Sequence, residues 1–146
     1  MNNNIPAQLK LPLAAEQLLP HTYPMLLVDE LLTFDNGNGA VSAVVDTQSL
    51  FAAADNTVEM AALIELVAQS CAAVNGYNDL INNRAVRRGF LVGSSNFHVN
   101  RRPRCGEQLR IEVNTTAVFE AFSIVDGKVL TGTECLAAGS VKLWLS

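Results

Sequence analysis

Glu65 is the one charged residue in the apolar stretch MAALIELVAQSCAAVNGY, residues 60–77. A stretch of this length and composition predicts a long buried helix. An ionised carboxylate among apolar neighbours is costly unless it is paired, and burial favours its protonated form. A buried carboxylic acid can donate a proton near neutral pH, so Glu65 is a candidate general acid. The structural alternative is a helix carboxylate held by a buried partner, including one across a dimer interface.

The two histidines are candidates for a base. His21 lies in Pro20-His21-Thr22-Tyr23-Pro24, where it either fastens the N-terminal segment to a sheet or acts as a general base. His98 alternates with apolar residues in Asn96-Phe97-His98-Val99, a pattern typical of a strand. His21 is therefore the catalytic candidate of the two.

Three widely spaced cysteines, Cys71, Cys105 and Cys135, are present. An odd number without metal-ligand spacing predicts reduced thiols and a cytoplasmic location rather than disulfides or a zinc site. Cys71 falls inside the predicted helix, where it is expected to pack as a small apolar residue.

Basic residues are concentrated in one region of an acidic protein. The net charge is −4, yet a group of arginines falls within positions 84–104: Arg84, Arg87, Arg88, Arg101, Arg102 and Arg104. Such a group predicts an acidic or phosphorylated partner, and the alternative is a solvated loop with scattered ion pairs. Nucleic acid is not expected, because aromatic residues make up only 6% and no recognition motif is present.

The length of 146 residues predicts a single domain over residues 1–146, with a loose lead-in over residues 1–12. The hydrophobic fraction of 49% predicts a large core or a surface buried in an oligomer. No apolar run reaches the ~18–20 uncharged residues of a membrane span, since Glu65 and Gln69 interrupt the longest one.

Turn residues divide the first half of the chain. The patterns favour a short helix over residues 13–19, a strand over Met25–Phe34, a hairpin turn at Asn36-Gly37-Asn38-Gly39 and a return strand over Gly39–Asp46. The central helix is expected to begin after Asn56 as N-cap, with Glu59 completing a capping box. It is expected to end near Val74, before Asn75-Gly76.

The second half is rich in strands. Alternating patterns predict strands over Gly89–Val99, Gln108–Ala117, Phe119–Val125 and Lys128–Leu145, with Asp126-Gly127 as a tight hairpin between the last two. One long apolar helix in such a chain predicts an α+β domain, a curved antiparallel sheet wrapped around the helix. Dimerisation is expected to cover the sheet edges.

Four segments resemble one enzyme family, in order. LLPHTYPMLLVDELL (18–32) is similar to the N-terminal signature of the hotdog-fold 3-hydroxyacyl-[acyl-carrier-protein] dehydratases of type II fatty acid synthesis. IELVAQ (64–69) resembles their central helix, CGEQLRIEV (105–113) a Pro-Gly-Asp-Gln segment that begins a strand, and VDGKV (125–129) their terminal hairpin. The resemblance covers roughly residues 10–138 and implies a single hotdog domain.

The sequence departs from this family where its catalytic histidine is expected. The family carries a Gly-His-Phe-Pro phrase before the central helix and Pro-Gly at the helix start. The matching stretch SLFAAADNTVEM (49–60) contains no histidine, proline or glycine, and the histidine position falls near Leu50 and Phe51. This pattern is similar to a divergent branch, the accessory hotdog dehydratase-like proteins of aryl polyene pigment synthesis.

The resemblance implies a lyase that dehydrates 3-hydroxyacyl thioesters in fatty acid or polyene synthesis. Glu65 matches the catalytic glutamate, and His21 would replace the missing base. No cofactor is implied beyond the phosphopantetheine of an acyl carrier protein, which the arginines would dock. Glu59 at the helix start would repel an enolate there, which weakens the case for independent catalysis.

A homodimer, or a heterodimer with another hotdog subunit, is expected from the same resemblance. Two further functions stay open: a non-catalytic hotdog subunit that pairs with a histidine-bearing dehydratase, and an acyl-thioesterase.

Overall fold

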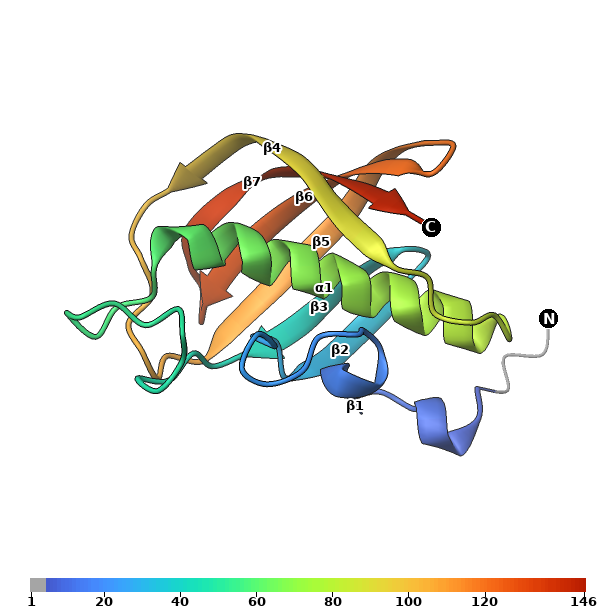
Figure 1. Cartoon of the computed structure of the whole chain (residues 1–146), viewed down its shortest axis with the longest axis horizontal. Helices are drawn as coiled ribbons and strands as arrows, with labels where there is room; N and C mark the ends of the chain where they lie inside the picture. The colour runs from blue at the N-terminus through green and yellow to red at the C-terminus, as the bar shows by residue number, and fades with distance from the viewer. Residues whose placement is uncertain (1–4) are drawn as a thin grey trace.

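The computed structural model describes residues 5–146, which form one long helix and a set of antiparallel strands (Figure 1). In chain order these are β1 (Leu13–Ala14), β2 (Glu30–Asp35), β3 (Asn38–Ala43), α1 (Met60–Ile81), β4 (Gly89–Val99), β5 (Leu109–Phe119), β6 (Phe122–Thr131) and β7 (Glu134–Leu145). Residues 1–4 of the expected lead-in lie outside the described residues, and the rest of the lead-in contains one 3-10 turn, Ala7–Leu9.

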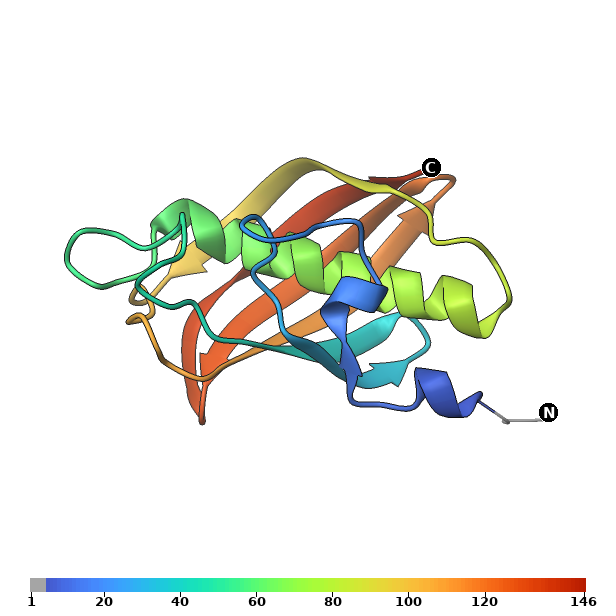
Figure 2. The same ribbon diagram turned by 60° about the horizontal axis from the view of Figure 1, so that its bottom comes forward.

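The strands form a single sheet in the order β1-β2-β3-β5-β6-β7-β4. The sheet curves around α1, which crosses its inner face (Figures 1 and 2). Register shifts interrupt the β5–β6, β6–β7 and β4–β7 pairs, and such irregularities bend a sheet. The expected α+β architecture, a curved antiparallel sheet around one helix, is confirmed.

The core lies between α1 and the inner face of the sheet. Leu63, Leu66 and Val67 on the helix are fully buried, as is Ile111 on β5. Each such side chain contributes about 1.5–3 kcal/mol through burial. The sheet therefore positions the helix, and the helix in turn positions Glu65.

The helix begins and ends later than the sequence predicts. Asn56 does not cap it: this residue has a φ of 63° in a loop closed by a bridge between Ala52 and Val58. α1 starts at Met60 with no side-chain cap and continues through Asn75-Gly76 to Ile81. Gly76 allows close packing, because a Cβ there would collide with the carbonyl oxygen of Leu18.

The sequence predicts a hairpin at Asp126-Gly127, and this prediction is wrong. β6 runs straight through these residues, and Gly127 pairs with Val113 of β5. A Cβ at Gly127 would overlap the side chain of Val67, so the glycine brings the sheet close to the helix.

The N-terminal segment also differs from the prediction. The short helix expected over residues 13–19 is replaced by β1 and one 3-10 turn, Ala15–Gln17. β2 begins at Glu30 rather than Met25, which leaves residues 21–28 as an irregular segment against the helix.

Candidate active site

Glu65 lies in the second turn of α1, with 27% of its side chain exposed. Gln69, one turn later, donates a hydrogen bond from Nε2 to Glu65 Oε1 at 2.9 Å. His21 Nε2 lies 3.7 Å from the same oxygen, which is too long for a hydrogen bond. No residue within 5–146 donates a hydrogen bond to Oε2, so this oxygen is free to exchange a proton.

Gln69 ties the Glu65 carboxyl to the N-terminal segment. Its side chain is buried, its Oε1 accepts the Leu27 N–H at 2.8 Å, and its Nε2 also donates to the Met25 carbonyl at 2.9 Å. Both amide hydrogens and the amide oxygen are thus used. Sequence reasoning assigned Gln69 no role; the signal for it is its four-residue spacing from Glu65, which places both on one helix face.

His21 is a neighbour of Glu65, but no residue within 5–146 forms a hydrogen bond with its second ring nitrogen, Nδ1. Its Nδ1 is buried and has no hydrogen-bond partner among the described residues. A histidine that acts as a base gains a second N–H, and an acceptor for that N–H normally holds the ring. The structure brings His21 to Glu65, and its role as a base stays a prediction.

A small pocket of about 80 Å³ opens beside Glu65, between α1 and the strands β4 and β7. His21, Glu65, Gln69 and Asn75 form its polar lining. Its apolar lining comes from Ala68, Ala72, Leu91, Leu143 and Leu145. An apolar pocket with a few convergent polar groups is the usual form of a small-molecule site.

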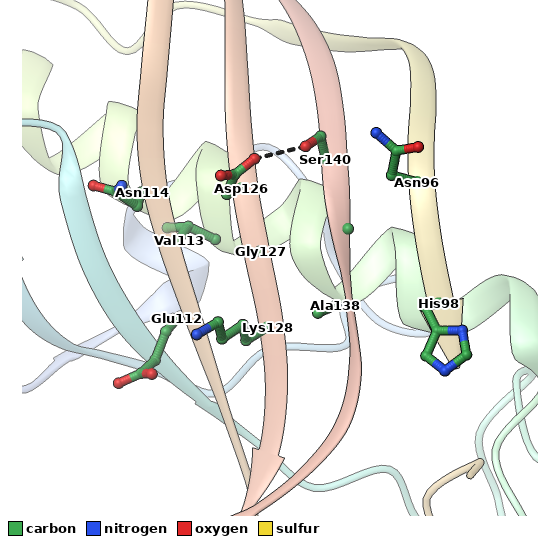
Figure 3. A pocket seen from close by; sticks show the side chains of 11 residues that line it. Asn96, His98, Glu112, Val113, Asn114, Asp126, Gly127, Lys128, Ala138 and Ser140 are labelled. Carbon is green, nitrogen blue, oxygen red and sulfur yellow. Dashed lines mark hydrogen bonds between the residues drawn. The ribbon is translucent and has the colours of Figure 1, made fainter. Parts of the chain in front are cut away.

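The loop before α1, where the catalytic histidine of the resembling family is expected, contains no histidine. Leu50 is 64% exposed there, and the Phe51 carbonyl accepts the Glu59 N–H at 2.8 Å. His98 lies on the opposite, outer face of the sheet (Figure 3). Within residues 5–146, His21 is therefore the one histidine on the Glu65 side of the sheet.

Three of the arginines precede β4, and two of these hold a buried carboxylate. Arg84 and Arg87 each place Nη2 close to Oδ1 of Asp79, at 3.1 and 2.9 Å. Desolvation by itself would raise the pKa of Asp79, but hydrogen bonds from Arg87 and Arg84 and the charge of Arg87 outweigh it and lower that pKa. This cluster fixes the connection between α1 and β4.

The other three arginines follow β4, at its opposite end. Arg101 binds Glu107 at 2.8 Å and Glu134 at 2.9 Å, and its hydrogen bonds lower the pKa of Glu107 to about 2. Arg102 pairs with Asp55 at 3.1 Å.

Among the described residues, Arg88 and Arg104 are the members of the group whose side chains form no ion pair. The six arginines thus form two separate groups, and their role in binding a carrier protein stays a prediction.

A larger hollow of about 560 Å³ lies on the outer face of the sheet (Figure 3). Glu112, Asp126 and Lys128 line it, and the Ser140 hydroxyl donates to Asp126 Oδ1 at 2.6 Å. The sheet separates this hollow from Glu65, and its mixed charges are typical of a solvated sheet face. The candidate site therefore stays with Glu65.

The described part of the chain holds no group of three or more side chains placed to bind a metal. All three cysteines are free, and burial raises the pKa of Cys71 to about 12, as expected for a packed thiol. No helix in residues 5–146 is long and apolar enough to cross a membrane.

Comparison with known proteins places the chain in a family. A family model described as ApeP-like, ApeP dehydratase, matches residues 13–145. The chain belongs to the ApeP-like dehydratase family. This ApeP-like chain is also 33% identical over 130 residues to the 3-hydroxyacyl-[acyl-carrier-protein] dehydratase FabZ of Bacillus cereus (strain AH820), covering 82% of the chain and 88% of that protein. FabZ of Bacillus thuringiensis (strain Al Hakam) is 34% identical over the same length.

Solved structures share the fold of the ApeP-like chain. One chain of the dehydratase heterocomplex ApeI:P from Xenorhabdus doucetiae matches with a TM-score of 0.85 and 21% identity, covering 94% of this chain and 92% of that one. A hypothetical thioesterase with coenzyme A from Streptococcus pneumoniae TIGR4 matches with a TM-score of 0.65 and 12% identity, covering 80% and 84%. The expected hotdog fold is confirmed, and this fold hosts more than one chemistry.

Proposed function

We propose that Glu65 is the general acid of a site that dehydrates 3-hydroxyacyl thioesters carried by an acyl carrier protein. Removal of water requires an acid for the 3-hydroxyl group and a base for the α-proton. The supporting observation is a carboxyl group that Gln69 orients through Oε1 while Oε2 stays free beside an apolar pocket. Side chains and the phosphopantetheine of the carrier suffice for this chemistry, so the proposal needs no metal or further cofactor.

In this proposal a second hotdog subunit supplies the base. Among residues 5–146, His21 Nδ1 has no hydrogen-bond acceptor, and the loop at Leu50 and Phe51 contains no histidine. Glu59 stands at the start of α1, where a carboxylate opposes an enolate. The pocket reaches Gly89 and Leu91 of β4, an exposed edge strand on which a second subunit could complete the site.

Carrier-protein docking is proposed at the two arginine groups that flank β4. Arg88 precedes Gly89 of the pocket lining directly, and its guanidinium forms no ion pair with the described residues. Its guanidinium is therefore free to pair with an acidic group of a carrier protein.

The test is turnover of a 3-hydroxyacyl-carrier-protein substrate by the chain alone and mixed with a histidine-bearing hotdog subunit. Glu65→Gln keeps the size of the side chain but removes the acid, so turnover is expected to fall about 10²–10⁴-fold in whichever sample is active. Glu16→Gln, at an exposed carboxylate, is the matched control and is expected to keep full activity.

Unchanged turnover in Glu65→Gln would overturn the proposal. Activity of the chain alone that is lost in His21→Ala would assign the base to His21. Free acid in place of the enoyl product would identify a thioesterase.

A further inference from the structure

The two ring nitrogens of His21 lie in opposite environments. Nε2 is 3.7 Å from Glu65 Oε1, and the ring lines the pocket beside that carboxyl group. Nδ1 is buried and has no hydrogen-bond partner within residues 5–146. One nitrogen therefore faces an oxygen that can accept a hydrogen bond, and the other faces none.

These environments favour the neutral tautomer that carries its hydrogen on Nε2. A neutral imidazole has one N–H donor and one acceptor nitrogen. A hydrogen on Nδ1 would be a buried donor without an acceptor, which is costly. It would also turn the lone pair of Nε2 toward Glu65 Oε1, whose lone pairs already accept the hydrogen bond from Gln69. A hydrogen on Nε2 avoids both costs.

This tautomer makes His21 a hydrogen-bond donor rather than a base. An imidazole that takes up a proton at Nε2 carries its first hydrogen on Nδ1, where an oxygen acceptor normally holds it. The buried Nδ1 of His21 has no such acceptor among the described residues. Because Nδ1 itself is buried, it cannot reach a substrate proton either.

The spacing of His21 and Glu65 suits one shared oxygen atom. Two donors can bind the same oxygen when they lie within roughly 6 Å of each other, which is twice the length of a hydrogen bond. His21 Nε2 is 3.7 Å from Glu65 Oε1, and Oε2 is bonded to the same carbon. An oxygen in the pocket can thus accept hydrogen bonds from Nε2 of His21 and from a protonated Oε2.

We propose that His21 donates a hydrogen bond from Nε2 to the 3-hydroxyl oxygen that Glu65 protonates. This role rests on the proposed function of Glu65. The base of the second subunit takes the α-proton, and the electron pair of that C–H bond forms the C=C bond. The C–O bond breaks with its electron pair on the oxygen, which takes the Glu65 proton and leaves as water. The His21 N–H stabilises the negative charge that gathers on this oxygen, and the base then returns its proton to Glu65.

Long-range ¹H–¹⁵N NMR of the full chain reports the tautomer without turnover. His98→Ala leaves His21 as the single histidine, so its ring signals are assigned directly. We expect the nitrogen shifts to place the hydrogen on Nε2. Butanoyl pantetheine and its 3-hydroxy analogue are then added, and only the hydroxy analogue is expected to move the Nε2–H signal. A hydrogen on Nδ1, or the same response to both ligands, would overturn the inference.

Two substitutions separate a donor from a base in the mixed sample, measured above the activity of the partner alone. His21→Ala removes the donor, so kcat is expected to fall about 10²-fold with little change in KM. A glutamine amide can donate from the position of Nε2 but cannot take up a proton, so His21→Gln is expected to recover kcat about tenfold above His21→Ala. The control is His98→Ala on the outer face (Figure 3), which is expected to keep full activity. With circular dichroism confirming each fold, no recovery in His21→Gln would overturn the donor role.

Failure of the donor role and failure of the proposed function give different results. A hydrogen on Nδ1 together with a large loss of turnover in Glu65→Gln would refute the role of His21 alone. A hydrogen on Nε2 together with unchanged turnover in Glu65→Gln would refute Glu65 as the acid, and with it the step in which His21 takes part.

Discussion

Gln69 decides which oxygen of Glu65 can carry a proton. Its amide donates to Oε1, so a protonated Glu65 that keeps this hydrogen bond carries its proton on Oε2. The other bonds of Gln69 join the helix to the backbone of Met25 and Leu27. One buried side chain thereby orients the Glu65 carboxyl and holds the segment that contains His21.

Gln69→Leu is expected to destabilise the fold and to remove the hydrogen bond that orients the Glu65 carboxyl. The substitution leaves the buried Leu27 N–H without its acceptor, at a cost of about 1–3 kcal/mol, and removes the donor to the part-buried Met25 carbonyl. Urea denaturation measures the loss, with Gln48→Leu in an exposed loop as the control. Equal unfolding midpoints for Gln69→Leu and the unmodified chain would show that these bonds contribute nothing.

Glu65 could be singled out from the sequence because a lone charge in an apolar helix is a local signal. The contacts of Gln69 could not, because they depend on residues 25–27 lying beside the helix rather than in the strand expected there. The burial of His21 Nδ1 without a hydrogen-bond partner depends on the same packing and could not be predicted either. The sequence thus indicated Glu65, while the hydrogen bonds that orient its carboxyl and the unpartnered Nδ1 of His21 became visible only in three dimensions.

At the scale of the elements, glycines separate what the sequence can predict from what it cannot. The Asn36-Gly37 turn was predicted correctly, since its residues adopt the positive φ values of 47° and 84° that a tight hairpin demands. The sequence predicts a helix end at Gly76 and a hairpin at Gly127, but both glycines lie inside their elements. Their role is set by the distant residues Leu18 and Val67, which no local pattern contains.

Gly127→Ala tests this account of close packing. Its new methyl group would overlap the Val67 side chain and push the helix from the sheet, which is expected to cost about 1–3 kcal/mol. Gly93→Ala is the matched strand control, because no atom lies within 4 Å of the added Cβ. Thermal unfolding compares the two, and similar melting temperatures would contradict the explanation.

The Asp79 cluster connects α1 to β4, and its contribution should depend on pH. Arg84 and Arg87 lower the pKa of Asp79 below its ordinary value of 3.8, so the folded state favours the carboxylate. The stabilisation is therefore complete above the unfolded pKa and is lost as the pH falls through the lower folded pKa. Asp79→Asn is expected to cost about 1.5–3 kcal/mol at neutral pH and progressively less in acid. Urea denaturation across pH measures it, with exposed Asp35→Asn as control, and a pH-independent cost would contradict the assignment.

For the molecule as a whole, β4 forms an exposed edge with three consecutive large apolar residues. This strand ends the sheet, and Phe90, Leu91 and Val92 are 52%, 43% and 52% exposed. An edge strand with consecutive apolar residues and unpaired backbone groups favours association with another chain. Since Leu91 also lines the small pocket beside Glu65, a subunit paired along β4 would lie next to Glu65.

Val92→Asp is expected to weaken association of the chain with itself or with a hotdog partner by at least tenfold, because the new carboxylate would be buried without a counter-ion. Val118→Asp is the control: Val118 is 71% exposed but lies on β5, away from that edge. Native mass spectrometry and light scattering measure the assemblies of the chain alone and of the mixture. If the partner supplies the base, turnover should fall in parallel with association in Val92→Asp and stay unchanged in Val118→Asp. An assembly that Val92→Asp leaves intact would place the subunit contact elsewhere and leave Glu65 without a base from across β4.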